Sequence, residues 1–163
     1  MSTLKTNTIQ AATGSTVNVA SGQVFTAPGH VIQVVQSTSQ SAFTSTSTSY
    51  VDTGRSVEIT PKFATSKVLV TVSATMSASA INVQPVFTIY RDSTNLEVTS
   101  NRGFGQTFNG AGSSHMMLGC SFLDSPNTTS QVSYKIYVRT NSGTLIWGAD
   151  SGTQCYTAQE IAQ

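Results

Sequence analysis

The chain has 163 residues and a formal net charge of +1, with 9% charged and 38% hydrophobic residues. Serine and threonine supply about three residues in ten, which favours strands because branching at Cβ suits a pleated sheet and crowds a helix. Lysines and arginines are scattered singly, which argues against nucleic-acid binding, and no apolar run approaches the roughly 20 residues that span a bilayer. The composition predicts an all-β protein without nucleic-acid partners or membrane insertion.

The N-terminal region, residues 1–36, is predicted to be a short extended anchoring segment. It begins MSTLKTNTIQ, whose lysine is followed by no apolar stretch, so it is not a secretory signal. The β-prone pieces LKTNTI and STVNV are too short to bury much surface alone, so we expect them to pack against a partner. The turn APGH and the strand-like HVIQVVQ complete the region. The expected anchoring side chains are Leu4, Ile9, Val17 and Val19.

Residues 37–163 are predicted to form one β-domain, and its first hairpin is expected in TSTSTSYVDTGRSVEIT, residues 44–60. We interpret the hydroxyl run at 44–49 as an exposed edge strand and the DTG triplet at 52–54 as the turn. The alternating SVEIT is then the second strand of the hairpin.

Six further segments have the alternation or the apolar content of strands. They are SKVLVTVSAT, VQPVFTIYRD, SHMMLGCSFLD, QVSYKIYVRT, TLIWG and QCYTAQEIAQ. In the first of them Leu69 interrupts the alternation of the valines, which indicates a more deeply buried strand. Turn signals recur about every ten residues, a spacing typical of an antiparallel β-sandwich or jelly roll.

The residue types that carry chemistry do not gather in a catalytic or metal-binding pattern. His30, His115, Cys120 and Cys155 have no CxxC or HxxxH spacing. The acids lie singly beside turn residues, where aspartate commonly caps its own backbone, and no GxSxG elbow is present. We therefore predict no enzyme, no metal and no cofactor. The two cysteines are either buried thiols or one disulfide, and spacing alone leaves both open.

Three aromatic residues are candidates for binding a surface ligand. Phe104 and Phe108 lie in RGFGQTFNGAGS, the longest glycine-rich stretch, and Trp147 lies in TLIWG. Exposed rings offer large contact area, and loops on a rigid scaffold commonly carry binding residues. The alternative for Phe104 and Phe108 is that both rings fold back into the core. The candidate loops are 76–84, 92–112 and 140–153.

Several segments together resemble virion appendage proteins of tailed bacteriophages, above all tail-fibre and related structural proteins of phages that infect cyanobacteria and other aquatic bacteria. The resemblance runs through MSTLKTNTIQ, APGHVIQVVQ, TSTSYVDTGRSVEITPKFATSKVLVTVS, VFTIYRDST, SFLDSPNTTSQVSYKIYVRT and AQEIAQ. It covers most of the chain and depends on the order of these pieces. Long fibres have an extended shaft that this chain lacks, so a short fibre, a tip or a decoration protein fits better.

The resemblance implies a non-enzymatic virion protein, a short homotrimeric tail fibre or fibre-like appendage. Its N-terminal segment would dock on other virion proteins, and its β-domain would touch a host surface glycan or protein. Low charge fits permanent interfaces, whose cores are depleted in charged residues. The alternative is a capsid decoration protein, of the cement or head-fibre kind, that stabilises the head. A capsule depolymerase is disfavoured by the short length and the scattered acids. The protein is expected on the virion surface after synthesis in the bacterial host cytoplasm.

Overall fold

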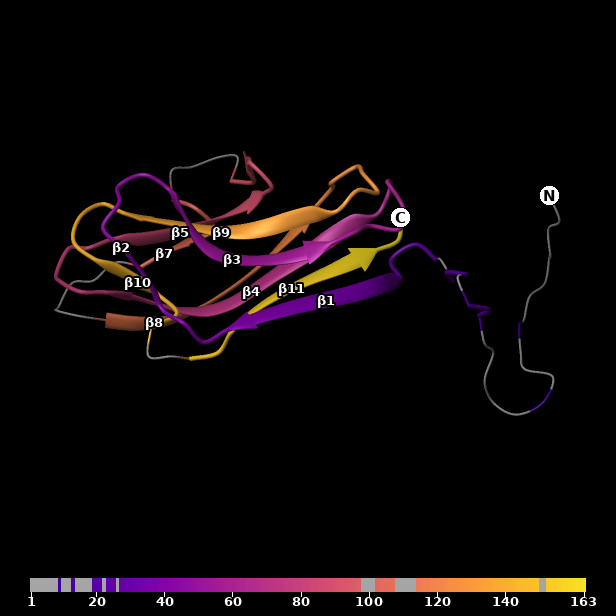
Figure 1. Cartoon of the computed structure of the whole chain (residues 1–163), viewed down its shortest axis with the longest axis horizontal. Coiled ribbons are helices and arrows are strands. Elements are labelled where there is room, and N and C mark those ends of the chain that lie inside the picture. The colour runs from indigo at the N-terminus through magenta and orange to yellow at the C-terminus, as the bar shows by residue number, and fades with distance from the viewer. Residues whose placement is uncertain are drawn as a thin grey trace.

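The computed structural model describes residues 9, 13, 19–21, 23–25, 27–97, 102–107, 114–149 and 152–163. Within these ranges the chain folds into two antiparallel sheets that pack face to face (Figure 1). The six-stranded sheet A contains β1 (Val31–Ser39), β2 (Phe43–Ser45), β4 (Lys67–Ala78), β8 (Ser114–Asp124), β10 (Leu145–Trp147) and β11 (Gln154–Ile161). The five-stranded sheet B contains β3 (Val51–Ile59), β5 (Pro85–Arg91), β6 (Thr94–Asn95), β7 (Gly105–Gln106) and β9 (Val132–Thr140). The predicted all-β antiparallel sandwich is confirmed.

Strand β4 is the centre of sheet A because it pairs with three strands. β8 pairs along the whole of one edge without a register shift, and β11 and β10 share the other edge. From Lys67 to Met76 its side chains alternate between half-buried and buried positions, and the last two residues of the strand are both buried. Leu69 was expected to break this alternation, but it lies half-buried on the outer face between two buried valines. No residue of β4 is exposed, so the predicted more deeply buried strand is confirmed, although Leu69 itself belongs to the outer face.

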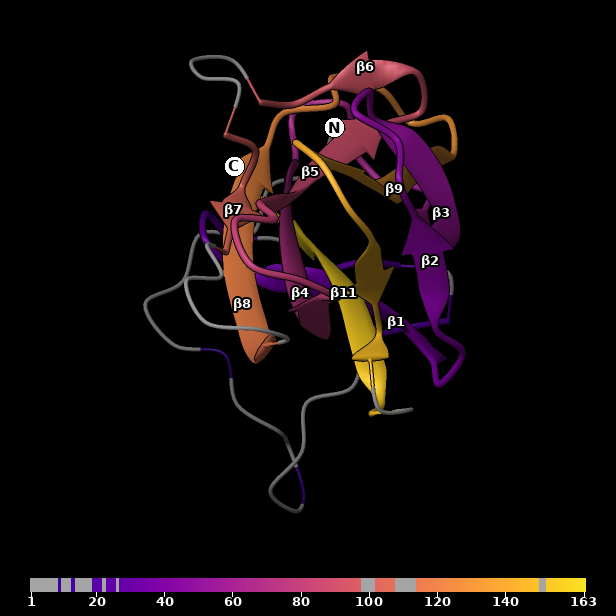
Figure 2. The same ribbon diagram turned by 90° about the vertical axis from the view of Figure 1, so that its left-hand side faces the viewer.

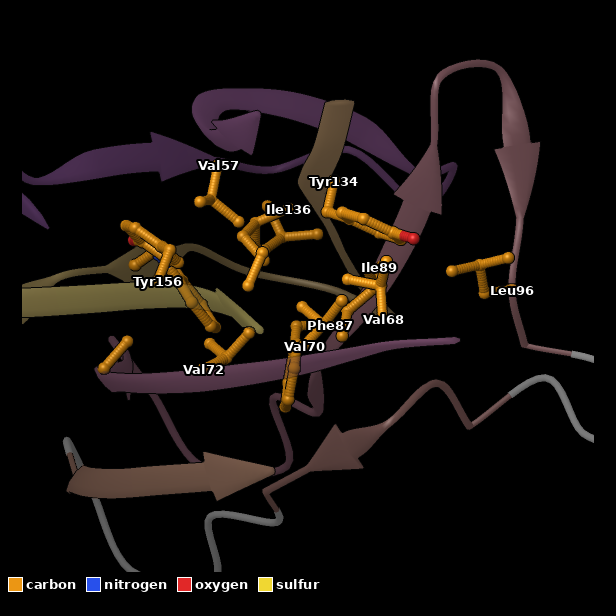
Figure 3. Packing of buried hydrophobic residues seen from close by; sticks show 14 of the residues in the cluster. Val57, Val68, Val70, Val72, Phe87, Ile89, Leu96, Tyr134, Ile136 and Tyr156 are labelled. Atoms are coloured by element: carbon orange, nitrogen blue, oxygen red, sulfur yellow. The ribbon is translucent and has the colours of Figure 1, made fainter. Parts of the chain in front are cut away.

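The core lies between the two sheets and is built from their inward side chains. Figure 3 shows the valines of β4 across from Tyr134 and Ile136 of β9, with Phe87 and Ile89 of β5 close by. Trp147 is the largest fully buried side chain, and its ring centroid lies 5.2 Å from that of Phe87. β-Branched and aromatic side chains pack well on a pleated surface, so these strands supply the two inner faces.

The sandwich begins earlier than the predicted domain boundary. β1 pairs with β11 along its length, starting with Val31 opposite Ile161. The boundary expected between residues 36 and 37 therefore falls inside β1. The last part of the predicted anchoring segment, residues 31–36, is a strand of sheet A.

The start of β1 lies beside the end of the chain (Figure 1). The Gly29 N–H donates to Ala162 O, and the Ala162 N–H donates to His30 O, each at 2.9 Å. Gly29 has a φ of 82°, a left-handed conformation that glycine adopts without strain. The turn predicted at APGH is therefore present, and it seats the entering chain against the C-terminal residues.

The stretch 44–60 does not form the predicted hairpin. β2 ends at Ser45 and pairs with β10 in sheet A, whereas β3 lies in sheet B. Between them the Ser47 N–H donates to Ser45 Oγ at 3.1 Å, and the Ser49 N–H donates to Ser47 Oγ at 3.2 Å. Local hydrogen bonds of this kind compete with a strand ladder. The serines therefore end β2 early and let the chain cross to the other sheet.

The predicted turn at 52–54 is a bulge within β3. The register with β9 shifts after Asp52. Gly54 has a φ of 70°, and its N–H donates to Asp52 Oδ1 at 2.8 Å. The Thr53 hydroxyl donates to Ile136 O at 2.9 Å, which attaches the bulge to β9. A bulge uses the same residue types as a turn, so the triplet alone did not distinguish the two.

A buried carboxylate near the end of β11 holds the loop between β3 and β4. Glu160 is fully buried. Its Oε1 accepts the Lys62 N–H at 2.8 Å and the Phe63 N–H at 3.2 Å, and its Oε2 accepts Gln33 Nε2 at 2.6 Å. Burial raises the pKa of Glu160, but hydrogen bonds to the charged form outweigh burial and lower this pKa below its ordinary value. The loop, β1 and β11 therefore share one ionised acceptor.

A second buried carboxylate joins the two sheets. Asp124, at the end of β8, accepts Arg91 Nη1 of β5 at 2.9 and 2.8 Å, and it accepts the Tyr134 hydroxyl of β9 at 2.8 Å. Asp124 is 7% exposed and Tyr134 is 1% exposed. Burial and the nearby carboxylate raise the pKa of Tyr134, so its hydroxyl stays a donor. Arg91 and Tyr134 of sheet B thus clamp the edge strand of sheet A.

Gly103 is the point where segment 102–107 touches the edge of β5. It has a φ of 65°, and a Cβ there would lie 2.0 Å from Phe87 O and 2.8 Å from a Val86 side-chain carbon. Gly103→Ala should lower the free energy of unfolding by about 2 kcal/mol or more, because the added atom meets backbone in a region of φ that favours glycine. Urea unfolding followed by the fluorescence of the single tryptophan measures this loss.

Gly119→Ala is the matched control for that substitution. Gly119 lies exposed on β8, and a Cβ there would meet nothing nearer than Val72 O at 4.0 Å. We expect its free energy of unfolding to change by less than about 0.5 kcal/mol. Equal losses in the two variants would contradict the steric explanation.

Candidate functional site

The outer face of sheet B carries tyrosines and charged side chains. β9 alternates between the core and the outer face, so Lys135, Tyr137 and Arg139 lie outward. β3 places Asp52 opposite Tyr137, and β5 places Tyr90 opposite Lys135. Tyr50 and Glu97 lie on the same side, because the Tyr50 ring contacts Arg139 and the Tyr50 hydroxyl donates to Glu97. We name the set the tyrosine face: Tyr50, Asp52, Tyr90, Glu97, Lys135, Tyr137 and Arg139.

The rings of the tyrosine face are held by one another and by their charged neighbours. Tyr90 and Tyr137 stack with 4.0 Å between ring centroids and 26° between ring planes. The Arg139 guanidinium lies 5.2 Å from the centroid of the Tyr50 ring, within the range of a cation–π contact. The Tyr50 hydroxyl donates to Glu97 Oε2 at 3.0 Å. These contacts fix the rings before any ligand binds, which reduces the entropy lost on binding.

The phenols of this face are hydrogen-bond donors at neutral pH. Burial raises the pKa of Tyr50 and of Tyr90. Burial followed by the Asp52 carboxylate raises the pKa of Tyr137. Because each pKa lies above its ordinary value near 10, all three side chains keep their protons. The face therefore offers hydroxyl donors beside two carboxylates and two cations.

The chemistry of the tyrosine face suits recognition of a broad polar surface. Tyrosine and arginine are enriched at interfaces and at their energetic centres, and tyrosine supplies a rigid ring with a polar tip. Stacked rings offer apolar area to a sugar or a side chain, and the carboxylates can accept hydrogen bonds from hydroxyl groups. Its charges balance, so the face fits a neutral or mixed-charge ligand better than a strongly charged one.

A polar cavity of about 220 Å³ lies where β1 meets β3. Arg55 Nη2 donates to Ser41 O at 2.9 Å, and Arg55 Nη1 donates to Thr53 O at 3.3 Å. This guanidinium therefore ties the β3 bulge to the connection that follows β1. The cavity can hold water or a small polar group. Its lining is Ser37, Thr38, Ser39, Gly54, Arg55, Ser56 and Tyr156.

Trp147 is fully buried, so its prediction as a surface-binding residue is wrong. Its Nε1–H donates to the Tyr156 hydroxyl at 2.9 Å, and β10 pairs with both β2 and β4. A short strand between turn signals resembles a loop in the sequence, whereas here it closes the core. The predicted loop 140–153 contains this strand, and the predicted loop 76–84 begins inside β4.

The two phenylalanine candidates have different outcomes. Phe104 is half-buried against the core, and its ring meets that of Phe122 edge-on with 5.0 Å between centroids. This contact supports the alternative that the ring folds inward. Phe108 lies outside the described residues, so its binding role stays a prediction.

Of the four predicted anchoring residues, two are among the described residues and two are not. Ile9 is 65% exposed and Val19 is 51% exposed, which leaves both side chains available to a partner. Leu4 and Val17 lie outside the described residues. The anchoring role of all four stays a prediction.

Cys120 and Cys155 are free thiols, which resolves the choice left open by their spacing. They lie on the two strands that flank β4, opposite Val72 and Ser73 respectively. Cys120 is turned toward the core, where burial raises its pKa to about 11. Cys155 belongs to the outer face of sheet A.

Sequence reasoning did not select the tyrosines. In QVSYKIYVRT the core side of the strand supplies the valines, Tyr134 and Ile136, so the opposite side is left with Lys135, Tyr137 and Arg139. The signal available in the sequence was a period-two face that combines an aromatic residue with charges. The three residues lie along a strand, so the expectation that binding residues lie in loops excluded them.

Comparisons with known proteins gave matches to solved structures only. No protein-family model matches the chain, and no curated protein matches it. A structure of the Gx strain of infectious bursal disease virus is 15% identical, covers 90% of this chain and 36% of its own, and has a TM-score of 0.48. A mutant VP2 protein of the same virus, in derived T=1 particles, is 14% identical, covers 90% of this chain and 40% of its own, and has a TM-score of 0.46. The chain therefore spans well under half of the length of these proteins.

The described part of the chain has neither a metal-binding cluster nor a membrane-spanning helix. Its histidines, cysteines and acids form no group of three that could hold a metal ion. The same residues include no helix with the length and apolar character needed to cross a membrane.

Proposed function

We propose that the chain is a non-enzymatic structural protein of a virion, a short trimeric tail fibre or fibre-like appendage. It docks through its N-terminal segment and exposes the sandwich for contact with a host surface. Its partners are further copies of itself, other proteins of the tail or capsid, and a host surface glycan or protein. It is made in the cytoplasm of the bacterial host and joins the virion there.

The observation that carries this proposal is the tyrosine face. It is a broad, preordered surface of rings and balanced charges on a rigid sheet, which suits an extended ligand such as a cell-surface glycan or protein. The resemblance of the sequence to phage appendage proteins supports the virion as the place where such a surface would act. The low charge of the chain fits the permanent contacts that a virion requires.

Labelling of intact virus particles tests the proposal. Antibody raised against the purified chain is expected to mark the tail or its tip in electron micrographs. Label on the head would support the alternative, a capsid decoration protein that stabilises the head. Absence of label from purified particles, with the protein present in the infected cell, would overturn both.

Tyr137→Ala should weaken binding to susceptible host cells at least about tenfold, because truncating a central interface aromatic commonly costs more than 1 kcal/mol. The stack with Tyr90 is lost as well, so the second ring is also no longer held in place. Titration of fluorescently labelled protein on host cells measures the change. The variant should keep the circular dichroism spectrum of the wild type.

Phe63→Ala is the matched control for this measurement. Phe63 is 39% exposed in the loop between β3 and β4, and its removal takes an aromatic ring from a different surface. Its binding should equal that of the wild type. Unchanged binding of the Tyr137 variant would remove the tyrosine face from the host contact.

A further inference from the structure

Between Lys67 at one end and His115 at the other, the outer face of sheet A has no charged side chain across four adjacent strands. The pairing registers place its outward residues in rows that cross β8, β4, β11 and β1. We name the set the neutral face. Its first three rows are Leu123, Leu69, Gln159 and Val34, then Ser121, Thr71, Thr157 and Gln36, then Gly119, Ser73, Cys155 and Thr38. Met117, Thr75 and Ile161 complete it, and Lys67 and His115 lie at its two ends.

The neutral face combines apolar side chains with hydroxyls that bond to one another. Met117 is 76% exposed, Val34 is 57% exposed and Leu123 is 47% exposed. In the middle row Gln36 Nε2 donates to Thr157 Oγ1 at 3.0 Å, and the hydroxyls of Thr71 and Ser121 lie 3.2 Å apart. Polar groups already paired within the face lose less when water is removed. This surface can therefore be covered at small desolvation cost.

The neutral face is bordered by two edge strands, β1 and β8, and among the described residues nothing protects the outer edge of β8. β8 pairs with β4 along one side, and none of the described strands pairs with its other side (Figure 2). Monomeric proteins usually guard such an edge with charges, prolines or bulges. Between His115 and Asp124 the strand has none of these, and its register with β4 is unbroken. An open edge next to an open neutral face indicates one continuous contact surface.

We infer that the neutral face and the adjoining β8 edge are the surface through which copies of this chain join, with the face turned toward the axis of the trimer. The inference rests on the proposed function and names the surface that would form its oligomer. Around a rotation axis a charged side chain lies close to copies of itself, and like charges repel. A face without charge has no such repulsion, whereas the tyrosine face would bring its lysine and arginine together with their own copies.

The size of the neutral face is sufficient for a specific contact. Outward residues are about 6.8 Å apart along a strand, and strands are about 4.8 Å apart, so its fifteen residues cover roughly 500 Å². Two such faces reach the roughly 1,000 Å² expected of a specific interface, and the β8 edge adds to it.

Thr157→Lys tests this assignment by placing a cation in the middle row of the neutral face. The matched control is Gln131→Lys, which adds the same charge at an exposed position before β9, where Gln131 Nε2 lies 3.1 Å from Glu58 Oε2. Light scattering coupled to size-exclusion chromatography at micromolar concentration gives the mass of each species. We expect a trimer mass for the wild type and for the control, and a monomer mass for Thr157→Lys.

The outcomes separate this inference from the proposed function. A trimer that survives Thr157→Lys overturns the neutral face as the joining surface and leaves the virion role intact. A control variant that also dissociates shows a general effect of charge and overturns the assignment. A wild-type monomer overturns both the assignment and the trimer, whereas labelling of virus particles still decides whether the protein is a virion component.

Cys155 supplies a second readout, because it lies on the neutral face and is native to the chain. When the inward Cys120 is replaced by alanine, Cys155 is the one thiol left that a maleimide can modify. A maleimide should modify Cys155 at least about tenfold faster in a Thr157→Glu variant than in the wild-type background, because covered thiols react slowly and a neighbouring carboxylate disfavours the reactive thiolate, so it cannot itself speed the reaction. Equal rates, with the wild type still oligomeric, would overturn the assignment. Matching circular dichroism spectra exclude unfolding as the cause.

Discussion

Replacing Glu160 by alanine should lower the free energy of unfolding at neutral pH by about 3–4 kcal/mol. The substitution leaves two backbone N–H groups without their acceptor, and it removes one of the two acceptors of Gln33 Nε2, which also donates to Thr60 O at 2.7 Å. Each buried donor left unpaired costs about 1–3 kcal/mol, and the loss is greater where the acceptor was charged. Urea unfolding measures the change, and hydrogen exchange should show faster exchange at the Lys62 and Phe63 amides than at β4.

Glutamine at position 160 separates the charge from the shape. Because the pKa of Glu160 is lowered on folding, its ionised form stabilises the fold above its unfolded pKa, near 4.3. This contribution is lost as the pH falls through the lowered folded pKa. The difference in free energy of unfolding between the wild type and Glu160→Gln should therefore be constant above about pH 5 and shrink below about pH 4. A difference that grew on acidification would contradict this account.

Replacing Asp124 by alanine should lower the free energy of unfolding by about 3 kcal/mol. Removing one partner of a buried ion pair typically costs 3–5 kcal/mol. The lower end applies because the Arg91 side chain is 25% exposed and recovers part of its hydration. For a chain of this length such a loss corresponds to a fall in Tm of roughly 6–12 °C, which calorimetry measures.

A double-mutant cycle tests whether the hydrogen bond between Asp124 and Tyr134 contributes to this loss. Tyr134→Phe removes the buried hydroxyl that donates to Asp124 Oδ2. In the wild-type background it should cost about 1 kcal/mol, and in the Asp124→Ala background it should be neutral or stabilising, because the orphaned hydroxyl is gone. Additive losses would mean that the two residues do not act together.

The strands were predictable where one face of each is buried. In β4 and β9 the inward valines, Tyr134 and Ile136 recur at every second residue, and the burial pattern of both strands follows that period. The hairpin at 44–60 was not predictable, because its outcome depends on two partners that are distant in sequence. β2 pairs with β10, and β3 pairs with β9. Hydroxyl-rich residues and the DTG triplet fit a strand end, a turn or a bulge equally well.

The candidate site was less predictable than the fold. Trp147 looked exposed because it lies in a short segment among glycines, and only the pairing of β10 with two strands shows that it fills the core. Tyr90 and Tyr137 stack because β5 and β9 are neighbours. Their strands are separated in the sequence by β6, β7 and β8. A contact between strands that are not consecutive cannot be read from local pattern.

The hydrogen bonds between Gly29, His30 and Ala162 have a practical consequence for any engineered form of this protein. Because the entry to the sandwich and the chain end meet at one pole, a short linker between residue 163 and residue 29 should permit circular permutation without stretching the ladder of β1 and β11. A fusion at the C-terminus would sit beside the entering chain and compete with whatever that segment docks on. A peptide or domain inserted near Ser142, between β9 and β10, would leave the end of the sandwich around Gly29 and Ala162 unobstructed.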